Sequence, residues 1–297
     1  MVARKHNGST VHRRQLGRML KEARLQSGVS ISDAAAAIQR SNSTVFRIEG
    51  GDGPTRGPEV YVLCQTYGLS VQMTEALVAV ARETTSRGWW APHRDVIPEW
   101  FNLYLGMEQS ASEFRWYEAE VVPGTFQVED YTRAIIADSY PNIDQSDMHA
   151  RIAVRQQRQA LLLRDISPPT IRAVINEAVV RRPVGGRRVM AAQCLRLAQL
   201  STLPNIELRV LPFSAGLHAG VMTGPFTILS FPAPESGRPS DPPTVYVEGY
   251  VGALYLDQED EVMRYDQAFD RISAATGDPS GDKTREILWK ASQEADA

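Results

Sequence analysis

The segment SNSTVFRIEGG, residues 41–51, reads as one short helix with a marked beginning and a marked end. Ser41 is a residue type that caps helix N-termini, and Gly50-Gly51 is typical of a helix end. Val45 and Ile48 lie three residues apart, which predicts one apolar face that packs inward. The segment therefore predicts a short amphipathic helix, with Ser41 as its N-cap.

Hydrogen-bonding side chains crowd the first turns of this predicted helix. Asn42 can pair with adenine, Ser43 and Thr44 can serve several acceptors, and Arg47 suits guanine or phosphate. A helix that only packs against its neighbours has no need of four such side chains. Because polar residues are also common at helix starts, the pattern alone leaves open a DNA-reading helix and a plain, well-capped one.

Two helices are predicted before this segment and two after it. Apolar residues recur at three- and four-residue steps over residues 11–26, where Gly28 marks the end. Ser30, with Asp33 three positions on, begins an alanine-rich helix over residues 31–39. A helix, a tight turn and a second short helix are the helix-turn-helix plan, in which the second helix lies in the major groove of DNA. The two later amphipathic helices are expected at residues 58–67, with Val60, Leu63 and Cys64 inward, and at residues 70–82, with Met73, Leu77 and Val80 inward.

The stretch LGRMLKEARLQSGVSISDAAAAIQRSNSTVFRIEGG, residues 16–51, resembles the XRE (Cro/C1, lambda-repressor-like) family of helix-turn-helix regulators. The resemblance implies that Glu49 stabilises the fold through a local ion pair. Ile31 stands where the family often has Gln. The residues that the resemblance places against double-stranded DNA are Ser30, Ile31, Ser41, Asn42, Ser43, Thr44 and Arg47.

Charge is distributed unevenly between the start of the chain and the rest. The net charge is −3, but residues 1–56 carry ten Arg or Lys against four Asp or Glu, which is +6, so the remaining residues carry −9. A basic head on an acidic body indicates that the head meets a polyanion and the body does not. We expect a helix-turn-helix domain over residues 1–83, a docking linker with Trp89, Trp90 and Trp100 over 84–100, and an α+β domain over 101–297.

The second half of the chain mixes helical and strand patterns. Short β-branched or aromatic runs bounded by Pro or Gly predict strands at residues 170–175, 206–211, 225–231, 244–250 and 252–257. Helices are expected at residues 98–105, 110–121, 129–138, 145–163 and 187–201, and two more close the chain. Met263, Phe269 and Ile272 form the predicted inner face of the first closing helix. The order predicts a small mixed β-sheet in an α+β domain.

This body resembles the uncharacterised domain that follows XRE modules in many actinobacterial regulators, of the Scr-type antitoxin-like and WhiJ-like kinds. The motifs that carry the resemblance include WYEAEVVPGTFQVEDYTRAII and PNIELRVLPFSAGLHAGVMTGPFTILSF. Gln127 and Tyr131 keep the family pattern, although the family's paired Leu is absent here. The resemblance implies a sensory or partner-binding domain, whose partner is a small protein encoded next door.

Three further residues are candidates for binding a partner or a ligand. Glu177 precedes Arg181-Arg182, and Glu248 lies inside a predicted strand, so each carboxylate either pairs with arginine or receives a ligand. His218 lies in a loop rich in Gly and Ala, which either covers a pocket or simply connects two strands.

No pattern in the sequence indicates catalysis, a cofactor or a metal site. The chain has no Gly-rich phosphate loop, HExxH, CxxC or GxSxG. We expect neither a signal peptide nor a membrane helix, and two buried free thiols, Cys64 and Cys194. The sequence predicts a cytoplasmic, nucleoid-associated regulator that binds an operator as a homodimer. The alternative is an antitoxin-like module that sequesters a small neighbour-encoded protein, with DNA binding serving autoregulation.

Overall fold

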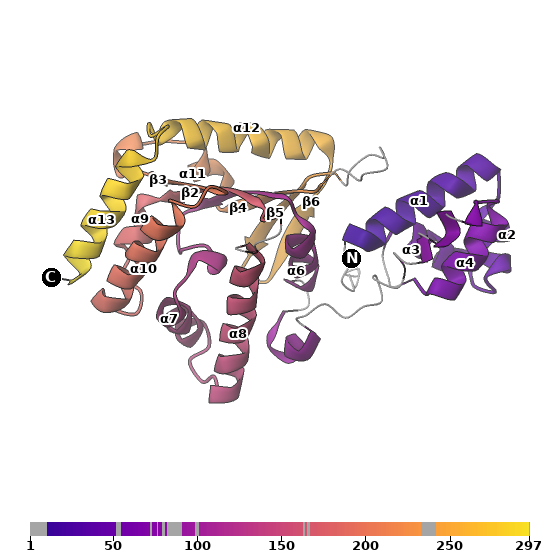
Figure 1. The fold of residues 1–297 in the computed structure, drawn as a ribbon, viewed down its shortest axis with the longest axis horizontal. Helices are drawn as coiled ribbons and strands as arrows, with labels where there is room; N and C mark the ends of the chain where they lie inside the picture. Colours follow the sequence, from indigo (N-terminus) through magenta and orange to yellow (C-terminus); the bar gives the residue numbers. More distant parts are fainter. Residues whose placement is uncertain are drawn as a thin grey trace. The chain divides into compact units, whose positions relative to one another are not determined.

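The computed structural model describes residues 11–51, 55–71, 73–75, 77–78, 81, 91–98, 101–162, 164, 167–232 and 242–296. These residues belong to two compact units, residues 1–110 and 111–297. The elements of the first unit are α1 (Val11–Ser27), α2 (Ile31–Ala37), α3 (Asn42–Glu49), α4 (Gly57–Thr66), η1 (Ala91–Val96) and α6 (Phe101–Ser110) (Figure 1). No helix in these residues is both long and apolar enough to cross a membrane.

The first four predicted helices are confirmed. Their inner faces form one core that includes Leu16, Leu20, Val45 and Leu63, each almost fully buried. α2 ends at a turn in which Gln39 adopts a left-handed backbone conformation, and α3 begins five residues after α2 ends. This tight connection fixes the direction of α3. Within the range predicted for the fifth helix, the described residues 71, 73–75, 77–78 and 81 are all helical. Val80 and the three linker tryptophans lie outside the described residues.

The second unit is an α+β domain with a six-stranded mixed sheet, one strand more than predicted. Its order is β3-β2-β1-β4-β5-β6, with parallel pairs β1–β2 and β2–β3 and antiparallel pairs beyond β1. The strands are β1 (Glu113–Glu118), β2 (Thr170–Asn176), β3 (Ile206–Leu211), β4 (Phe226–Ser230), β5 (Thr244–Gly249) and β6 (Gly252–Leu256). The helices are η2 (Gly124–Phe126), α7 (Glu129–Ser139), α8 (Gln145–Leu162), α9 (Glu177–Arg181), α10 (Arg187–Leu200), η3 (Phe213–Ala215), α11 (Gly220–Thr223), α12 (Glu259–Ala275) and α13 (Asp282–Asp296).

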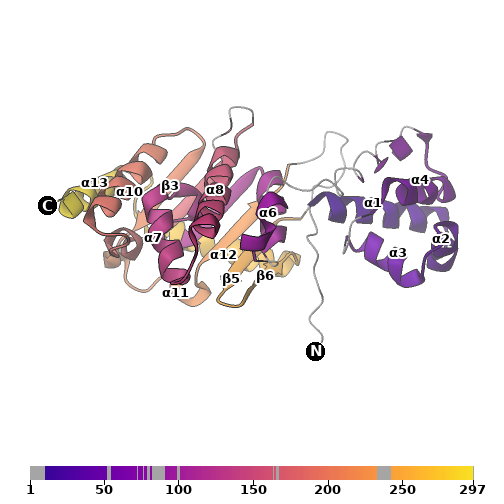
Figure 2. The same cartoon turned by 90° about the horizontal axis from the view of Figure 1, so that it is seen from below.

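Helices cover both faces of the sheet. α12 lies along one face, and α7, α8 and α10 lie on the other (Figures 1 and 2). On the α12 face, Tyr117, Ile228 and Phe269 belong to one buried cluster. On the opposite face, Trp116 packs edge-on against Phe126 at 5.1 Å between ring centroids. Alternate residues of β1 therefore enter two separate cores.

This two-sided burial explains the one element predicted with the wrong secondary structure. Residues 110–121 were expected to be helical, but residues 113–118 form β1. Residues 113–116 alternate polar and apolar side chains, but Tyr117 breaks the alternation because it enters the core on the second face of the sheet. Arg115, which makes the segment look amphipathic, pairs with Glu113 and with Asp266 of α12.

The remaining core predictions for the body hold with one exception. Phe269 and Ile272 are buried on the inner face of α12, but Met263, predicted to lie with them, is half exposed. Cys64 and Cys194 are buried free thiols, as expected, and burial raises the pKa of each to about 11. Neither thiol is therefore ionised at neutral pH.

Candidate nucleic-acid interface

The helix predicted to read DNA has one buried face and one exposed face. Val45 and Ile48 of α3 point into the core, while Asn42, Ser43 and Arg47 are exposed. Within the described part of the chain, the side chains of Asn42 and Arg47 make no hydrogen bond or ion pair. An amide and a guanidinium that are free and on a helix surface are the groups that pair with adenine and guanine edges.

Hydroxyl groups form a small cluster at the start of α3. Ser41 occupies the N-cap position, as predicted, but its side chain does not bond to a backbone N–H of the first turn. Its Oγ lies 2.8 Å from Ser43 Oγ and 3.0 Å from Thr44 Oγ1. The first-turn N–H groups of α3 therefore lack a side-chain cap, which suits a helix end that meets a phosphate.

Phe46 is an exposed aromatic residue on this surface that the sequence did not single out for DNA. Its side chain is 58% exposed. Phe46 lies three residues after Ser43 and four after Asn42, so the three residues share one face of α3. An exposed ring beside an amide offers an apolar contact for the methyl group of thymine. The signal available in the sequence was helical spacing, which places Phe46 away from the face that carries Val45 and Ile48.

The start of α2 has the predicted cap. Ser30 Oγ accepts the backbone N–H of Asp33 at 3.1 Å and donates to Asp33 Oδ2 at 2.7 Å. Ser30 is exposed, whereas Ile31 is half buried and packs against the core of the unit. Of these two predicted DNA contacts, Ser30 is the one whose side chain faces solvent.

A buried ion pair fixes α3 on α1. Arg24 Nε donates to Glu49 Oε1 at 2.6 Å, and Arg24 Nη2 donates to Glu49 Oε2 at 3.0 Å. Arg24 also donates to the carbonyl of Val29, and its pairing with Glu49 raises the pKa of the guanidinium. The structural role expected for Glu49 is thus confirmed: it clamps the C-terminal end of α3.

Gly17 brings α1 close to the same end of α3. A Cβ atom at this position would lie 2.5 Å from the carbonyl oxygen of Ile48 and 2.7 Å from that of Glu49. No side chain fits between the two helices there. The position of α3 is therefore set by backbone contact as well as by the Arg24–Glu49 pair.

In the body, the two residues that keep the family pattern are internal hydrogen-bonding residues. Gln127 is buried; its Nε2 donates to Val122 O at 2.7 Å, and its Oε1 accepts from Thr132 and from Arg155. Tyr131 is fully buried, and its hydroxyl accepts the backbone N–H of Val122 at 3.2 Å. Both residues fasten the segment around η2 to α7.

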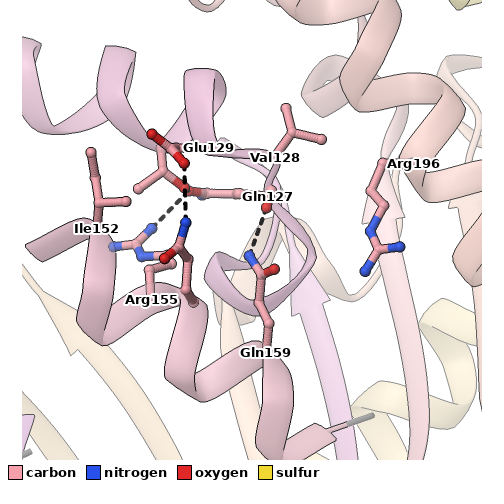
Figure 3. Close-up of a pocket in the computed structure, with 9 residues that line it drawn as sticks. Gln127, Val128, Glu129, Ile152, Arg155, Gln159 and Arg196 are labelled. Atoms are coloured by element: carbon pink, nitrogen blue, oxygen red, sulfur yellow. Dashed lines mark hydrogen bonds between the residues drawn. The ribbon is translucent and has the colours of Figure 1, made fainter. Parts of the chain in front are cut away.

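A pocket of about 230 Å³ opens beside Gln127. It lies among η2, α7, α8 and α10, and Figure 3 shows Arg155 and Gln159 of α8 directed towards Gln127, with Arg196 of α10 apart from them. Gln159 Nε2 donates to Gln127 O at 2.7 Å. The pocket is also lined by Val128, Glu129, Thr132, Ile152 and Gln156.

The other three candidates lie at one edge of the sheet but do not form a single cluster. Glu177 accepts from Arg181 and from the backbone N–H of Phe213 at 2.9 Å. His218 stacks edge-on against Tyr117 at 6.0 Å, and burial lowers its pKa. Glu248 is exposed and accepts from the hydroxyl of Tyr246 at 2.8 Å.

Glu118, at the end of β1, is an unusual carboxyl that the sequence did not identify. Burial raises its pKa to about 8, and the negative charge of Glu248 adds to the effect. The raised pKa depends on burial in the folded body, which the sequence does not reveal.

No group of His, Cys, Asp and Glu among the described residues has the arrangement of a metal site.

The fold and the exposed face of α3 define a helix-turn-helix DNA-binding protein, and residues 15–77 match a helix-turn-helix domain family. Residues 101–289, more than half of the chain, match the domain of unknown function DUF5753. The chain therefore belongs to the DUF5753 family. Neither the curated proteins nor the solved structures include a significant match.

Proposed function

We propose that this protein is a sequence-specific transcriptional regulator whose α3 reads DNA in the major groove. The observation that carries the proposal is the exposed face of α3, where Asn42 and Arg47 are free of partners within the described residues and Val45 and Ile48 anchor the opposite face. The excess of basic residues in the first 56 positions supports it, since phosphate contacts provide most of the affinity for DNA.

The operator is a pseudo-palindrome bound by a homodimer. One recognition helix contacts only a few base pairs, so a single head gives little discrimination. Two heads related by a two-fold axis double the contacted sequence. The protein acts in the cytoplasm, on the nucleoid.

The body acts as a regulatory domain that binds a small protein partner or an effector and carries no catalytic activity. The pocket beside Gln127 and the exposed apolar side chains at the end of the sheet support this role. Its resemblance to the Scr-type antitoxin-like and WhiJ-like regulators points the same way. A partner shifts operator affinity only if it binds the DNA-competent state more or less tightly than the other state.

The test begins with genome-wide immunoprecipitation of the tagged protein, which yields an operator. Arg47→Ala is then expected to weaken binding to that operator by about 1–3 kcal/mol and to relax specificity at one position. The matched control is Arg264→Ala, which removes the same charge from an exposed position of α12. An unchanged footprint and affinity in Arg47→Ala would remove α3 from the interface.

A second function, an antitoxin-like module that sequesters a neighbour-encoded protein, is favoured by the exposed apolar residues of the body. The two functions differ in what the partner does to DNA binding. A partner that changes operator affinity when added to the full chain supports the regulator. A partner that binds tightly and leaves operator affinity unchanged supports sequestration.

A further inference from the structure

A surface loop of the body, residues 212–225, contains no charged residue. The surrounding stretch from residue 211 to residue 230 also has none, in a chain that is 23% charged. The loop contains η3 and α11 and connects β3 to β4. Loops exposed to water are normally polar, so this composition requires another explanation.

The loop is fixed to the body through small and aromatic residues. A Cβ atom at Gly220 would lie 2.3 Å from the ring of Tyr117, so α11 rests directly on that buried ring. His218 packs edge-on against the same ring, and Glu177 accepts the N–H of Phe213. The loop therefore has a defined shape, and its outer side chains have defined positions.

The side chains that point outward are large and apolar. Leu217 and Met222 are each 85% exposed, and Phe213 and Val221 are more than half exposed. Single exposed apolar residues are normal, but four of them in ten residues without a charge are typical of an interaction site. Binding of a partner would remove these side chains from water.

The surroundings of the loop are acidic. α11 packs against α12, which carries five carboxylates and two arginines. Glu248 lies at the same end of the sheet as Tyr117, because β4 pairs Phe226 with Tyr117 and Thr227 with Tyr246. A second copy of the body would bring the same carboxylates together, whereas a basic surface would be attracted.

We propose that loop 212–225 is the docking surface for a basic amphipathic segment of a partner protein. The segment would place apolar side chains over Leu217 and Met222 and lysine or arginine beside Glu248 and α12. This inference rests on the proposed regulatory role of the body and names the surface and the chemistry through which it acts.

The first experiment uses the full chain in the cells that produce it. A photoreactive amino acid replaces Met222 or, as control, Trp289 on α13, which is also exposed. The expected result is a cross-link from position 222, absent from position 289, to an apolar segment of another protein flanked by lysine or arginine. A cross-link to a second copy of the chain or to an acidic segment, or no product specific to position 222, would overturn the proposal.

The second experiment measures binding of the cross-linked segment as a synthetic peptide to the purified full chain. Met222→Lys and Leu217→Lys are each expected to weaken binding roughly tenfold or more, because a charge enters the apolar contact. Glu248→Lys is expected to weaken it less and to reduce its dependence on salt. Leu195→Lys, at an exposed position of α10, is the control and leaves binding unchanged. Equal affinities across all four variants would exclude the loop.

Failure of this inference can be distinguished from failure of the proposed function. The same variants lie outside the helix-turn-helix unit, so each is expected to bind the operator with wild-type affinity when no partner is present. If the loop variants bind both the operator and the peptide as tightly as the wild type, the docking surface is rejected and the regulator is not. If the wild-type chain binds no operator at all, the proposed function as a regulator is rejected.

Discussion

The surface of α3 and loop 212–225 present opposite chemistry. α3 exposes an amide, hydroxyls and a guanidinium on a helix clamped by a buried ion pair, and loop 212–225 exposes uncharged apolar side chains on a loop that rests on a ring. Reading base edges requires hydrogen-bonding groups in fixed positions, whereas covering an apolar segment requires area. The two units therefore suit different partners: the surface of α3 suits DNA, and loop 212–225 suits an apolar segment of a protein.

The largest expected effect comes from breaking the buried Arg24–Glu49 ion pair, which holds α3 against α1. Glu49→Ala leaves Arg24 charged and buried without its partner, which is expected to lower the free energy of unfolding of the N-terminal unit by about 3–5 kcal/mol. Hydrogen exchange of the α1 and α3 backbone in the full chain measures this locally. Exchange should quicken in the first unit and stay unchanged in the body.

Two further variants sharpen this prediction. Arg24→Met with Glu49→Leu removes both charges, and it should recover much of the lost stability because no buried charge is left alone. Arg40→Ala breaks the more exposed Arg40–Glu59 pair and should cost about 1 kcal/mol or less. Wild-type exchange rates in Glu49→Ala would show that the clamp does not hold α3.

The sequence was sufficient for the first unit because its signals are local. The helix periodicity, the cap at Ser30 and the local ion pair expected for Glu49 all lie within about fifty residues of one another, and the structure confirms each of them, with Arg24 as the partner of Glu49. β1 was missed because its central place in the sheet depends on pairing with strands more than fifty residues away. Glu118 was missed for the same reason, since its pKa depends on those neighbours.

An intermediate effect is expected from Glu118 as the pH changes. Its folded pKa, about 8, lies above the value of 4.5 for the unperturbed group, so the folded body holds a proton that the unfolded chain releases. The stabilisation is complete below pH 4.5 and is lost as the pH rises through 8. Thermal unfolding between pH 5 and pH 9 should therefore show falling stability in the wild type and a flatter profile in Glu118→Gln.

Glu248→Gln provides the internal check on this pH dependence. Removing its charge should lower the pKa of Glu118 and shift the loss of stability to lower pH, because the repulsion between the carboxylates disappears. Glu259→Gln removes an exposed carboxylate of α12 and should leave the profile as in the wild type. Identical profiles for the wild type and Glu118→Gln would show that this carboxyl titrates normally.

The smallest expected effect compares two exposed apolar side chains, Phe46 of α3 and Met222 of loop 212–225. If Phe46 contacts a thymine methyl group, Phe46→Ala should weaken operator binding by about 1 kcal/mol, the value of one buried methyl-sized group. Replacing that thymine with deoxyuridine removes the same methyl from the DNA and should cost the wild type a similar amount. Met222→Ala should leave operator binding unchanged.

Combining Phe46→Ala with the deoxyuridine operator forms a double-mutant cycle, which shows whether the two losses of binding come from one contact. Phe46→Ala bound to the deoxyuridine operator should be no weaker than Phe46→Ala bound to the normal operator, since the methyl has lost its partner. Additive losses at every thymine would instead mean that Phe46 acts by supporting α3. In that case only polar side chains of α3 would read the DNA, and the chemical contrast between α3 and loop 212–225 would be complete.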